Sequence, residues 1–390
     1  MTIRSPRLLV VDDNDDNRFT LTLLLEVEGF SDIAVAEDGV HALEKLDAES
    51  FDLVLLDVMM PRLNGYQVLE QLKAKGRLGD PPVIMITALN ELDSTVRCIE
   101  LGAEDYLPKP FNPVLLKARI RASLEKKRMR DEIRIHRDRM EMELQDARAL
   151  QLGLCPSSFP PPTVERPFDV AAVMEPAREV GGDLYDVFER RDGSLCFVVG
   201  DVSGKGAPAA LFMARTKDIV RLVGDAPSDR TGTLREPGEI LGRANDLLCA
   251  ANGSFMFVTL FVGVLGPGSS TLRYSSAGHN DPYRTSRDGC FGIVTTAKGR
   301  PLGIRKSSHY ATEHLSVRTG DALFIFTDGI TEATDATGGF FSEERLETCL
   351  RAHNTSSASE IVEGVMNAVR KFAAGTAQSD DITALAIRLV

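Results

Sequence analysis

Short apolar runs alternate with longer amphipathic stretches over the first third of the chain. The runs are rich in Val, Ile and Leu, which is typical of strands buried on both faces of a parallel sheet. The expected strands cover residues 8–11, 32–36, 53–56, 83–87 and 105–107. The intervening stretches, among them residues 17–28, 40–48 and 94–100, have helical periodicity. This order predicts a doubly wound α/β domain with a five-stranded parallel sheet.

A long stretch rich in charged residues comes next, at residues 114–154, without proline and with one late glycine. Apolar residues recur every seven positions from Ile133 through Met140 and Ala147 to Leu154, as in a coiled coil. We therefore expect a helical coiled-coil linker that joins two copies into a homodimer. A single amphipathic helix packed against its own domains is the alternative. The proline-rich residues 156–162 end the helix.

The remainder of the chain has many short apolar runs and few helical stretches. The expected strands cover residues 168–173, 195–200, 257–264, 271–276, 322–326 and 384–389, and the helices 207–223, 240–251, 341–350 and 359–372. Many strands with few crossovers predict an α/β sandwich of two mainly antiparallel sheets flanked by helices. The predicted organisation is a first domain at 1–122, the linker at 123–155 and a second domain at 156–390.

Composition narrows the class of protein. A length of 390 residues suits two domains and a connector. The net charge of −12 argues against nonspecific binding to nucleic acid. We expect a cytoplasmic protein without a membrane segment, because no apolar run approaches the roughly 20 residues that span a bilayer and the N-terminus lacks a secretory signal. The six cysteines stand singly, so neither a zinc site nor a disulfide framework is expected.

Three aspartates come directly after strands of the predicted parallel sheet. Asp12 and Asp13 follow the first strand and Asp57 follows the third. Because the carboxyl ends of parallel strands share one edge, these carboxylates should converge. With the backbone carbonyl of Met59 they would suit Mg²⁺. A carboxylate beside this cation can act as a nucleophile toward a phosphoryl group.

Three further residues fit the same chemistry. Lys109 is placed to neutralise charge on the transferring oxygens. Thr87 would donate a hydrogen bond to a new phosphoryl oxygen, and Tyr106 would change rotamer as Thr87 moves, which would form a switch. The alternative is that the acidic residues only terminate strands, as Asp often does in turns.

The segments "LLVVDDN", "LVLLDVMMPRLNGYQVL", "VIMITAL" and "GAEDYLPKPF" resemble the receiver domain of bacterial response regulators over about residues 5–122. The resemblance implies that Asp57 is the phosphoacceptor and that Asp12 and Asp13 hold Mg²⁺. It also implies a cis peptide between Lys109 and Pro110. The expected partner is a sensor histidine kinase or a phosphotransfer protein.

A second set of aspartates lies in small-residue turns at the ends of apolar runs. Its members are Asp183, Asp201, Asp328 and Asp380, and Asp381 follows the last of them. Gly181 and Gly182 would let the chain approach closely before Asp183. Carboxylates gathered without Cys or His suit Mg²⁺ or Mn²⁺ better than zinc. Two such ions could share a bridging hydroxide for in-line attack on phosphorus.

These turns resemble the metal-dependent serine/threonine phosphatases of the PPM family, in its bacterial stress and sporulation branch. The segments that carry the resemblance run from about residue 145 to the end: "ARALQLGLCPSSFPP", "EVGGDLYDVF", "VVGDVSGKGAPAALFMA", "SSAGHNDPY", "GRPLGI", "FIFTDGITEA" and "QSDDITALAI". The resemblance implies that Asp201 bridges two metals and that the Val202 carbonyl binds one. Asp183, Asp328 and Asp380 would complete the pair, with Asp381 a less certain ligand. Lys205 stands where some members of the family carry histidine.

Together the two resemblances predict a two-component response regulator whose output is metal-dependent dephosphorylation of a phosphoserine or phosphothreonine protein, gated by phosphorylation of Asp57. The resembled branch implies a phosphorylated anti-sigma-factor antagonist as substrate. The alternative is a catalytically silent phosphatase-fold adaptor that binds a sigma factor or another client under receiver control. A third hypothesis is a constitutive phosphatase whose receiver serves dimerisation or localisation; in that protein Asp57→Asn would leave activity unchanged.

Overall fold

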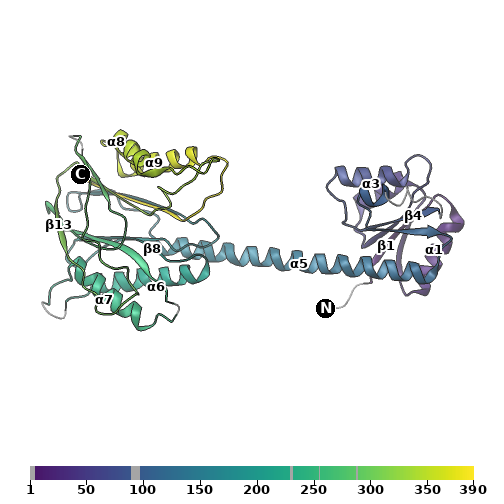
Figure 1. The fold of residues 1–390 in the computed structure, drawn as a ribbon, viewed down its shortest axis with the longest axis horizontal. Coiled ribbons are helices and arrows are strands. Elements are labelled where there is room, and N and C mark those ends of the chain that lie inside the picture. The colour runs from purple at the N-terminus through teal and green to yellow at the C-terminus, as the bar shows by residue number, and fades with distance from the viewer. Residues whose placement is uncertain (1–4, 89–96, 229–231, 254, 287–288) are drawn as a thin grey trace. The chain divides into compact units, whose positions relative to one another are not determined.

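The computed structural model describes residues 5–88, 97–228, 232–253, 255–286 and 289–390. The chain divides into two compact units, which we call the N-terminal unit (Met1–Met140) and the C-terminal unit (Glu141–Val390) (Figure 1). The division falls within one helix, α5, which covers Pro113–Leu154. Each unit has its own sheets and its own core, as the sequence predicts.

The N-terminal unit contains the predicted parallel sheet. Its strands are β1 (Arg7–Val11), β2 (Asp32–Ala36), β3 (Leu53–Asp57), β4 (Val83–Ala88) and β5 (Asp105–Lys109). They lie in the order β2-β1-β3-β4-β5, and all the pairs are parallel. The connecting helices include α1 (Asp15–Val27), α2 (Gly39–Ala48) and α3 (Gly65–Ala74). The helix expected at residues 94–100 lies partly outside the described residues, and residues 97–100 are helical.

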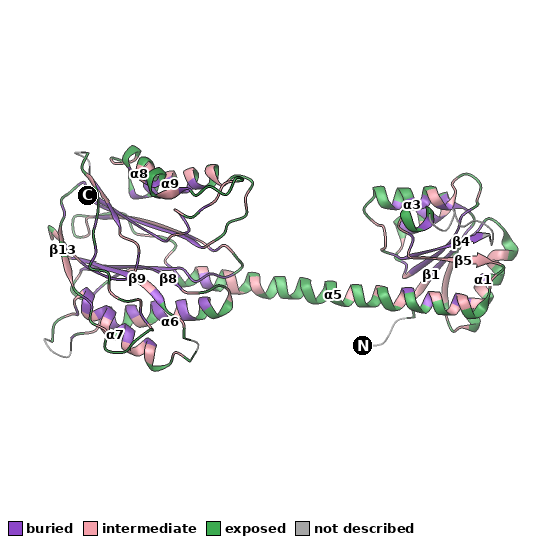
Figure 2. Cartoon of the chain, viewed as in Figure 1, coloured by how far each residue is buried: buried purple, intermediate pink, exposed green. Residues whose placement is uncertain are grey.

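Both faces of this sheet are buried. Leu9 and Leu56 pack on one face, whereas Leu8 and Leu55 pack on the other. Successive side chains of a strand point to opposite faces, so a strand covered on both sides needs a continuous apolar run. The purple strands of Figure 2 show this burial. The pattern explains why β1 and β3 are unbroken apolar runs in the sequence.

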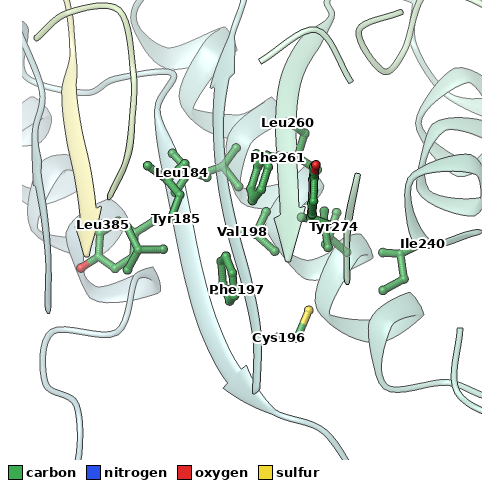
Figure 3. Close-up of a cluster of buried hydrophobic side chains, with 14 of the residues drawn as sticks. Leu184, Tyr185, Cys196, Phe197, Val198, Ile240, Leu260, Phe261, Tyr274 and Leu385 are labelled. Carbon is green, nitrogen blue, oxygen red and sulfur yellow. The ribbon is translucent and has the colours of Figure 1, made fainter. Parts of the chain in front are cut away.

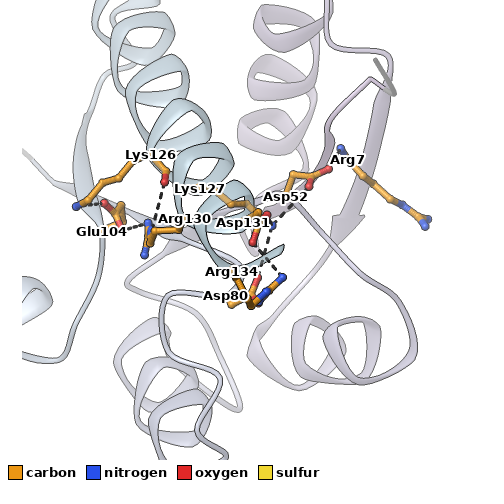
Figure 4. A network of polar contacts seen from close by, with 9 residues as sticks. All are labelled: Arg7, Asp52, Asp80, Glu104, Lys126, Lys127, Arg130, Asp131 and Arg134. Atoms are coloured by element: carbon orange, nitrogen blue, oxygen red, sulfur yellow. Dashed lines mark hydrogen bonds and ion pairs between the residues drawn. The ribbon is translucent and has the colours of Figure 1, made fainter. Parts of the chain in front are cut away.

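Helix α5 begins earlier than the predicted linker because the last helix of the N-terminal unit continues into it without a break. Leu116 and Ile120 in its first turns are buried against the sheet. Farther along, charged side chains hold the helix to the same unit (Figure 4). Arg130 pairs with Glu104 at 2.8 Å, and Arg134 pairs with Asp80 at 3.2 Å.

The predicted coiled-coil seam lies on the exposed part of α5, which is mostly green in Figure 2. Ile133 is 68% exposed and Met140 is 62% exposed. Burial of such exposed apolar side chains against a second apolar surface would stabilise a pair of helices. The pairing of two copies through α5 stays a prediction. No helix among the described residues is both long and apolar enough to cross a membrane.

The C-terminal unit is the predicted sandwich of two antiparallel sheets. Its strands are β6 (Phe168–Glu175), β7 (Leu184–Glu189), β8 (Leu195–Val202), β9 (Val258–Leu265), β10 (Thr271–Ala277), β11 (Tyr283–Thr285), β12 (Phe291–Ile293), β13 (Glu313–Ser316), β14 (Ala322–Phe326) and β15 (Ile382–Leu389). One sheet has the order β13-β10-β9-β8-β7 and the other β12-β11-β14-β15-β6. Strand β7 and the short strands β11, β12 and β13 were not among the expected elements. The three short strands have only three or four residues, which is too few to show a period.

Helices cover the outer face of each sheet. The pair α6 (Ala207–Gly224) and α7 (Pro237–Ala250) packs on the first sheet, and α8 (Ser342–Ala352) and α9 (Ala358–Phe372) lie together beside the second, where α9 packs against β6 and β15 (Figure 1). Strand β14 shows why two layers form. Its Leu323 and Ile325 join the core with the first sheet, whereas Phe324 and Phe326 join the core under α8 and α9.

The core that the two sheets share contains stacked aromatic rings. Phe197 on β8 stacks with Phe261 on β9 at 6.3 Å between centroids, and Phe261 stacks with Tyr274 on β10 at 5.8 Å (Figure 3). Leu385 of β15, in the other sheet, belongs to the same cluster. Burial of these large side chains fixes the register of β8 and β15. Two of the predicted acidic turns lie at the ends of these strands.

Candidate functional site

The first acidic site lies at the carboxyl edge of the parallel sheet. Asp12 follows β1 and is fully buried, and Asp57 ends β3 and is 4% exposed. Ligand oxygens of Asp12, Asp13 and Asp57 all lie within 4.8 Å of one another. Such a set of carboxylate oxygens fits a hard divalent cation such as Mg²⁺. The Lys109 ammonium, at the end of β5, lies 2.9 Å from Asp12 Oδ2 and 3.0 Å from Asp57 Oδ1.

The carboxylate of Asp12 is held in place from the start of α1. The backbone N–H of Asn14 donates to Asp12 Oδ1 at 2.9 Å, and the amide of Asn17 donates to both carboxylate oxygens at 3.1 and 3.2 Å. Asn17 was not among the predicted site residues, although its position one turn into α1 could have suggested it. Together with Lys109, these donors give both oxygens of Asp12 hydrogen-bond partners.

The surroundings of Asp57 favour its neutral form before a cation binds. Burial is the largest cause, and it raises the pKa of Asp57 to about 6 against the opposing effect of Lys109. The negative charges of Asp12 and Asp13 act in the same direction as burial. A cation bound at this site would lower the pKa of Asp57 again and favour its ionised form.

The remaining predicted residues of this site lie around the same edge. Thr87 is buried near the end of β4. Tyr106 on β5 is half-buried, and the Arg119 guanidinium lies 4.7 Å from its ring centre. Met59 is 76% exposed. Its predicted role as a ligand concerns its backbone carbonyl and not its side chain. The peptide between Lys109 and Pro110 is cis, as the receiver resemblance implies.

The second acidic site lies where strands of the two antiparallel sheets begin or end. Asp183 immediately precedes β7, and Asp201 is the penultimate residue of β8. Asp328 lies two residues after β14, and Asp380 lies two residues before β15. Strands β7 and β8 are neighbours in one sheet, and β14 and β15 are neighbours in the other. The four turns are thus contributed by two adjacent pairs of strands.

The two glycines before Asp183 allow the turns to pack closely. A Cβ atom on Gly182 would lie 2.8 Å from the carbonyl oxygen of Val202, and one on Gly181 would lie 2.4 Å from Asp381 Oδ2. Real Cβ atoms do not approach other atoms so closely, so only glycine fits at these positions. The Val202 carbonyl, a predicted ligand, is therefore held beside the loop that carries Asp183.

Asp381 has a different environment from its neighbour Asp380. Its Oδ1 accepts a hydrogen bond from the Ala177 N–H at 2.8 Å, and its Oδ2 accepts one from the Gly182 N–H at 2.6 Å. The side chain of Asp380 instead faces the Lys205 ammonium at 2.9 Å. Asp381 thus fastens the loop before β7. Asp380 accepts from Lys205 and from the Asp381 N–H, but it is the more exposed of the two carboxylates.

Burial and, after it, like charge raise the pKa values of Asp183, Asp201 and Asp328. Burial, followed by the charge of Asp201, raises the pKa of Asp183 well above its usual range. Burial, followed by the charges of Asp328 and Asp380, raises the pKa of Asp201 to about 7. The pKa of Asp328 is raised by burial and then by Asp380. The four carboxylates therefore repel one another, and a bound divalent cation would relieve that repulsion.

The carboxylates of the second site are more widely spaced than those of the first. In the part of the chain that the structure describes, the set of Asp12, Asp13 and Asp57 is the one group of three possible metal ligands closer than 4.8 Å to one another. The carboxylates of the second site interact through their charges at longer range. All of them are oxygen donors, so the set fits Mg²⁺ or Mn²⁺.

Neutral side chains orient parts of this site. The Thr327 hydroxyl donates to Asp183 Oδ2 at 2.7 Å. His279 is buried, its Nδ1 lies 3.1 Å from the Thr259 hydroxyl, and burial lowers its pKa to about 4. His279 is therefore a packed, neutral side chain near neutral pH. Thr327 precedes Asp328 in the same turn, but nothing in the sequence indicated that it binds Asp183.

The end of α5 touches the loop that carries Asp183. Gln151 is 5% exposed, and its amide Nε2 donates to the Gly181 carbonyl at 2.6 Å. Its Oε1 accepts a hydrogen bond from the Gly181 N–H at 3.0 Å. One side chain thus satisfies both backbone groups of a glycine two residues from Asp183. The sequence gives little sign of this contact, since Gln is common on exposed helix surfaces.

Comparison with known families agrees with this geometry. Residues 191–390 match the family model described as Stage II sporulation protein E (SpoIIE), which covers half of the chain. Residues 8–121 match the response regulator receiver domain. The first match contains Asp201, Asp328 and Asp380, and the second contains Asp12 and Asp57.

Two curated relatives illustrate the two halves. Protein IcfG of Synechocystis sp. is 31% identical over 266 residues, which cover 63% of this chain and 41% of that protein. The transcriptional regulatory protein CpxR of Escherichia coli is 50% identical over 120 residues, which cover 31% of this chain and 50% of CpxR. The chain thus spans half or less of the length of these curated relatives.

Among solved structures, the SiaA-PP2C domain of Pseudomonas aeruginosa matches 65% of this chain and 99% of that domain. The TM-score is 0.56 and the sequence identity is 20%, so this match shows a shared fold. Fold, acidic turns and family models point to the same assignment. The chain belongs to the SpoIIE family, and its C-terminal domain shares the fold of a PP2C domain and follows a region that matches the response regulator receiver domain.

Proposed function

We propose that this protein is a response regulator whose output is the metal-dependent removal of phosphoryl groups from phosphoserine or phosphothreonine in a protein substrate, gated by phosphorylation of Asp57. The observation that carries the proposal is the set of acidic turns from two adjacent strand pairs, whose carboxylates repel one another. The pKa of Asp183 is raised well above its usual range and that of Asp201 to about 7, both with neighbouring aspartates among the causes. Carboxylates perturb one another most strongly at functional sites.

In the receiver domain, Asp57 would act as the nucleophile. Its carboxylate oxygen attacks the phosphorus of a phosphohistidine on a sensor histidine kinase or phosphotransfer protein, and the P–N bond breaks as the histidine leaves. Lys109, at 3.0 Å from Asp57, neutralises charge on the phosphoryl oxygens. Asp12, Asp13 and the Met59 carbonyl would hold Mg²⁺, which supplies further neutralisation when bound.

The receiver's response would begin at β4 and β5. Thr87 is buried beside the phosphoacceptor edge and would donate a hydrogen bond to the new phosphoryl group. Tyr106 on the neighbouring strand would follow Thr87 by changing rotamer. Its ring lies under Arg119 of α5, so a change of rotamer would alter a contact of that helix.

In the phosphatase domain, Asp183, Asp201, Asp328 and Asp380 would hold two Mg²⁺ or Mn²⁺ ions together with the Val202 carbonyl, and Asp381 would be a ligand or a support for the loop. Bound ions of this kind lower the pKa of water and neutralise phosphoryl oxygens during in-line attack. Asp201, whose pKa is raised by burial and then by the charges of Asp328 and Asp380, would be one of these ligands. Asp381 would keep the loop before β7 in place through its bonds to Ala177 and Gly182.

Helix α5 would carry the signal between the two sites. It is one continuous helix from Pro113 to Leu154, and its Gln151 binds Gly181 beside Asp183. Coupling needs an element whose state both sites bias. We infer that α5, with its predicted pairing into a homodimer, is that element. The expected substrate is a phosphorylated anti-sigma-factor antagonist.

The test of the enzymatic part is hydrolysis of a phosphoserine protein and of p-nitrophenyl phosphate in the presence of Mn²⁺. The expected result is activity that EDTA removes and that Asp201→Asn lowers by about a hundredfold or more, since a proposed metal ligand is lost. Activity without a divalent cation, or full activity of Asp201→Asn, would contradict the metal-dependent mechanism. A folded protein without activity on several phosphoproteins would support the adaptor instead.

A further inference from the structure

A cavity of about 300 Å³ lies beside the acidic turns of the phosphatase domain. It is formed by the end of α9, the loop at residues 373–379 and the turn after β14. Two of its lining residues adjoin the proposed metal ligands: Gly329 directly follows Asp328, and Ser379 directly precedes Asp380. None of the roles proposed above involves this cavity.

The wall of the cavity is mainly apolar. Ala333, Met366, Val369 and Ile382 line it, and all four side chains are otherwise buried. A charged group placed here would lose hydration without a partner, which is costly. An apolar group would gain from leaving water.

The two charged residues that line the cavity do not make it suitable for a charged ligand. Among the described residues that line the cavity, these are Glu175 and Arg370, and they form an ion pair with each other. Their charges are therefore compensated before any ligand arrives. An uncharged, apolar ligand fits the cavity best.

The loop that closes the cavity is the loop that positions Asp380. The Gln378 amide donates to the carbonyl oxygens of Glu175 and Asp380, both at 2.8 Å. The Thr376 N–H donates to the Ala373 carbonyl at 2.9 Å. These bonds preform the cavity and tie its position to that of the catalytic turn.

We propose that this cavity binds an apolar side chain of the phosphoprotein substrate, close in sequence to the phosphorylated residue. The proposal rests on the phosphatase function proposed above. An extended chain advances about 3.3 Å per residue, so a substrate whose phosphoryl group reaches Asp328 and Asp380 has neighbouring residues within reach of a cavity that shares Gly329 and Ser379.

The size of the cavity fits a small apolar group. Its volume is at the lower end of the range of about 300 to 1,000 Å³ that is typical of small-molecule and cofactor sites. The cavity thus selects among substrates by the sequence around the phosphorylated residue, whereas the acidic turns act on the phosphoryl group of any of them.

The test compares peptides with a substrate that has no side chains. The peptides carry phosphoserine and have either Leu or Asn at each flanking position, and the small substrate is p-nitrophenyl phosphate, all with Mn²⁺. We expect the wild-type protein to prefer Leu at one flanking position by about tenfold in kcat/KM, as is usual for a hydrophobic pocket. Hydrolysis of p-nitrophenyl phosphate gives the activity that is independent of the cavity.

The variant Ala374→Phe should fill the cavity from its exposed rim. We expect it to abolish the preference for Leu and to leave hydrolysis of p-nitrophenyl phosphate unchanged. Ala377→Phe, at another exposed lining position, should do the same. The matched control is Ala336→Phe, which is also exposed but is not part of the lining, and it should retain the preference.

Three results would overturn the proposal: no preference in the wild-type protein, a preference that survives both lining variants, or a parallel loss of p-nitrophenyl phosphate hydrolysis in both. The last result would mean that the loop serves only to hold Asp380. If the wild-type protein hydrolyses neither kind of substrate, the phosphatase function itself fails, and this outcome is distinct from the other three.

Discussion

Asp201 is the residue at which the electrostatics of the phosphatase site converge. Its pKa of about 7 lies well above the ordinary value of 3.8, because of burial first and then the charges of Asp328 and Asp380. A folded state that binds a proton more tightly than the unfolded state loses stability as pH rises from the lower to the higher pKa. The cost of ionising Asp201 is therefore absent at acidic pH and present in full above about pH 7.

The first prediction concerns this cost. In EDTA, the thermal transition that shifts on addition of Mn²⁺ should fall in temperature from about pH 4 to about pH 7. Asp201→Asn should flatten that fall and raise the transition by a few degrees above pH 7, because it removes one of the repelling charges. Differential scanning fluorimetry measures both effects. The control is Asp218→Asn, at an exposed position on α6, and equal pH profiles of Asp201→Asn and this control would refute the prediction.

Lys205 supplies positive charge at the same site. Its ammonium lies 2.9 Å from Asp380 Oδ2 and donates to the Ser379 carbonyl at 2.7 Å. It also counteracts the raised pKa values of Asp201 and Asp328. Under the proposed function, Lys205 would compete with a cation for Asp380, although both side chains are more than a third exposed and solvent weakens the pair.

The second prediction is that Lys205→Met binds Mn²⁺ more tightly, with a Kd lower by about threefold, as befits an exposed pair. Isothermal titration calorimetry measures this binding without relying on activity. Lys298→Met is the matched control, because Lys298 is an exposed lysine 3.7 Å from a different aspartate, Asp281. Weaker binding by Lys205→Met than by the control would show that Lys205 supports Asp380 instead of competing for it.

At the level of single residues, the residues that lie at strand ends were predictable from the sequence. Asp12, Asp57 and Asp201 end or follow buried strands, so apolar patterns located them. Asn17 and Gln151 could not be located in the same way. Polar residues on helices are usually solvated, and neither the local contact of Asn17 with Asp12 nor the contact of Gln151 with Gly181, 30 positions away, leaves an apolar pattern.

Among the elements, α5 shows the strength and the limit of prediction from sequence patterns. Its length was predicted closely because the residues from 114 to 154 lack proline and have high helix propensity. The start of the linker at residue 123 stays a prediction, because α5 is one continuous helix and no break in it marks where a domain ends and a linker begins. The short strands β11, β12 and β13 were missed for the opposite reason, since they are too brief to show a period.

The third prediction concerns the contact between α5 and the catalytic loop. Gln151→Leu would leave the N–H and C=O of Gly181 without their partner, and an unsatisfied buried group costs about 1 to 3 kcal/mol. We expect faster hydrogen exchange in the loop before Asp183 and weaker Mn²⁺ binding by about tenfold. Hydrogen exchange with mass spectrometry and calorimetry measure the two effects.

The control for this contact is Gln145→Leu, which changes an exposed glutamine of the same helix. It should leave exchange and Mn²⁺ binding unchanged. If Gln151→Leu behaves like this control, α5 does not act on the loop through Gln151, and the signal must reach the site by another contact.

Under the proposed function, the whole molecule joins two acidic sites with opposite uses of phosphate. The receiver site has tightly grouped ligands and one lysine, which suits acceptance of a phosphoryl group by Asp57. The phosphatase site has more widely spaced ligands and an adjoining apolar cavity, which suits removal of a phosphoryl group from a protein. The fold of each half was predictable because the apolar patterns of many strands indicated the same fold class. The proposed control of one half by the other depends on a few polar contacts, which leave no such pattern.

The most direct test of receiver control is the rate of Mn²⁺-dependent hydrolysis of a phosphoserine protein with and without beryllofluoride, which mimics phosphorylated Asp57. We predict that beryllofluoride raises the rate severalfold in the wild-type protein and has no effect in Asp57→Asn, with Asp201→Asn as the blank. Equal rates with and without beryllofluoride, in a wild-type protein that hydrolyses the substrate and binds beryllofluoride, would contradict control by the receiver.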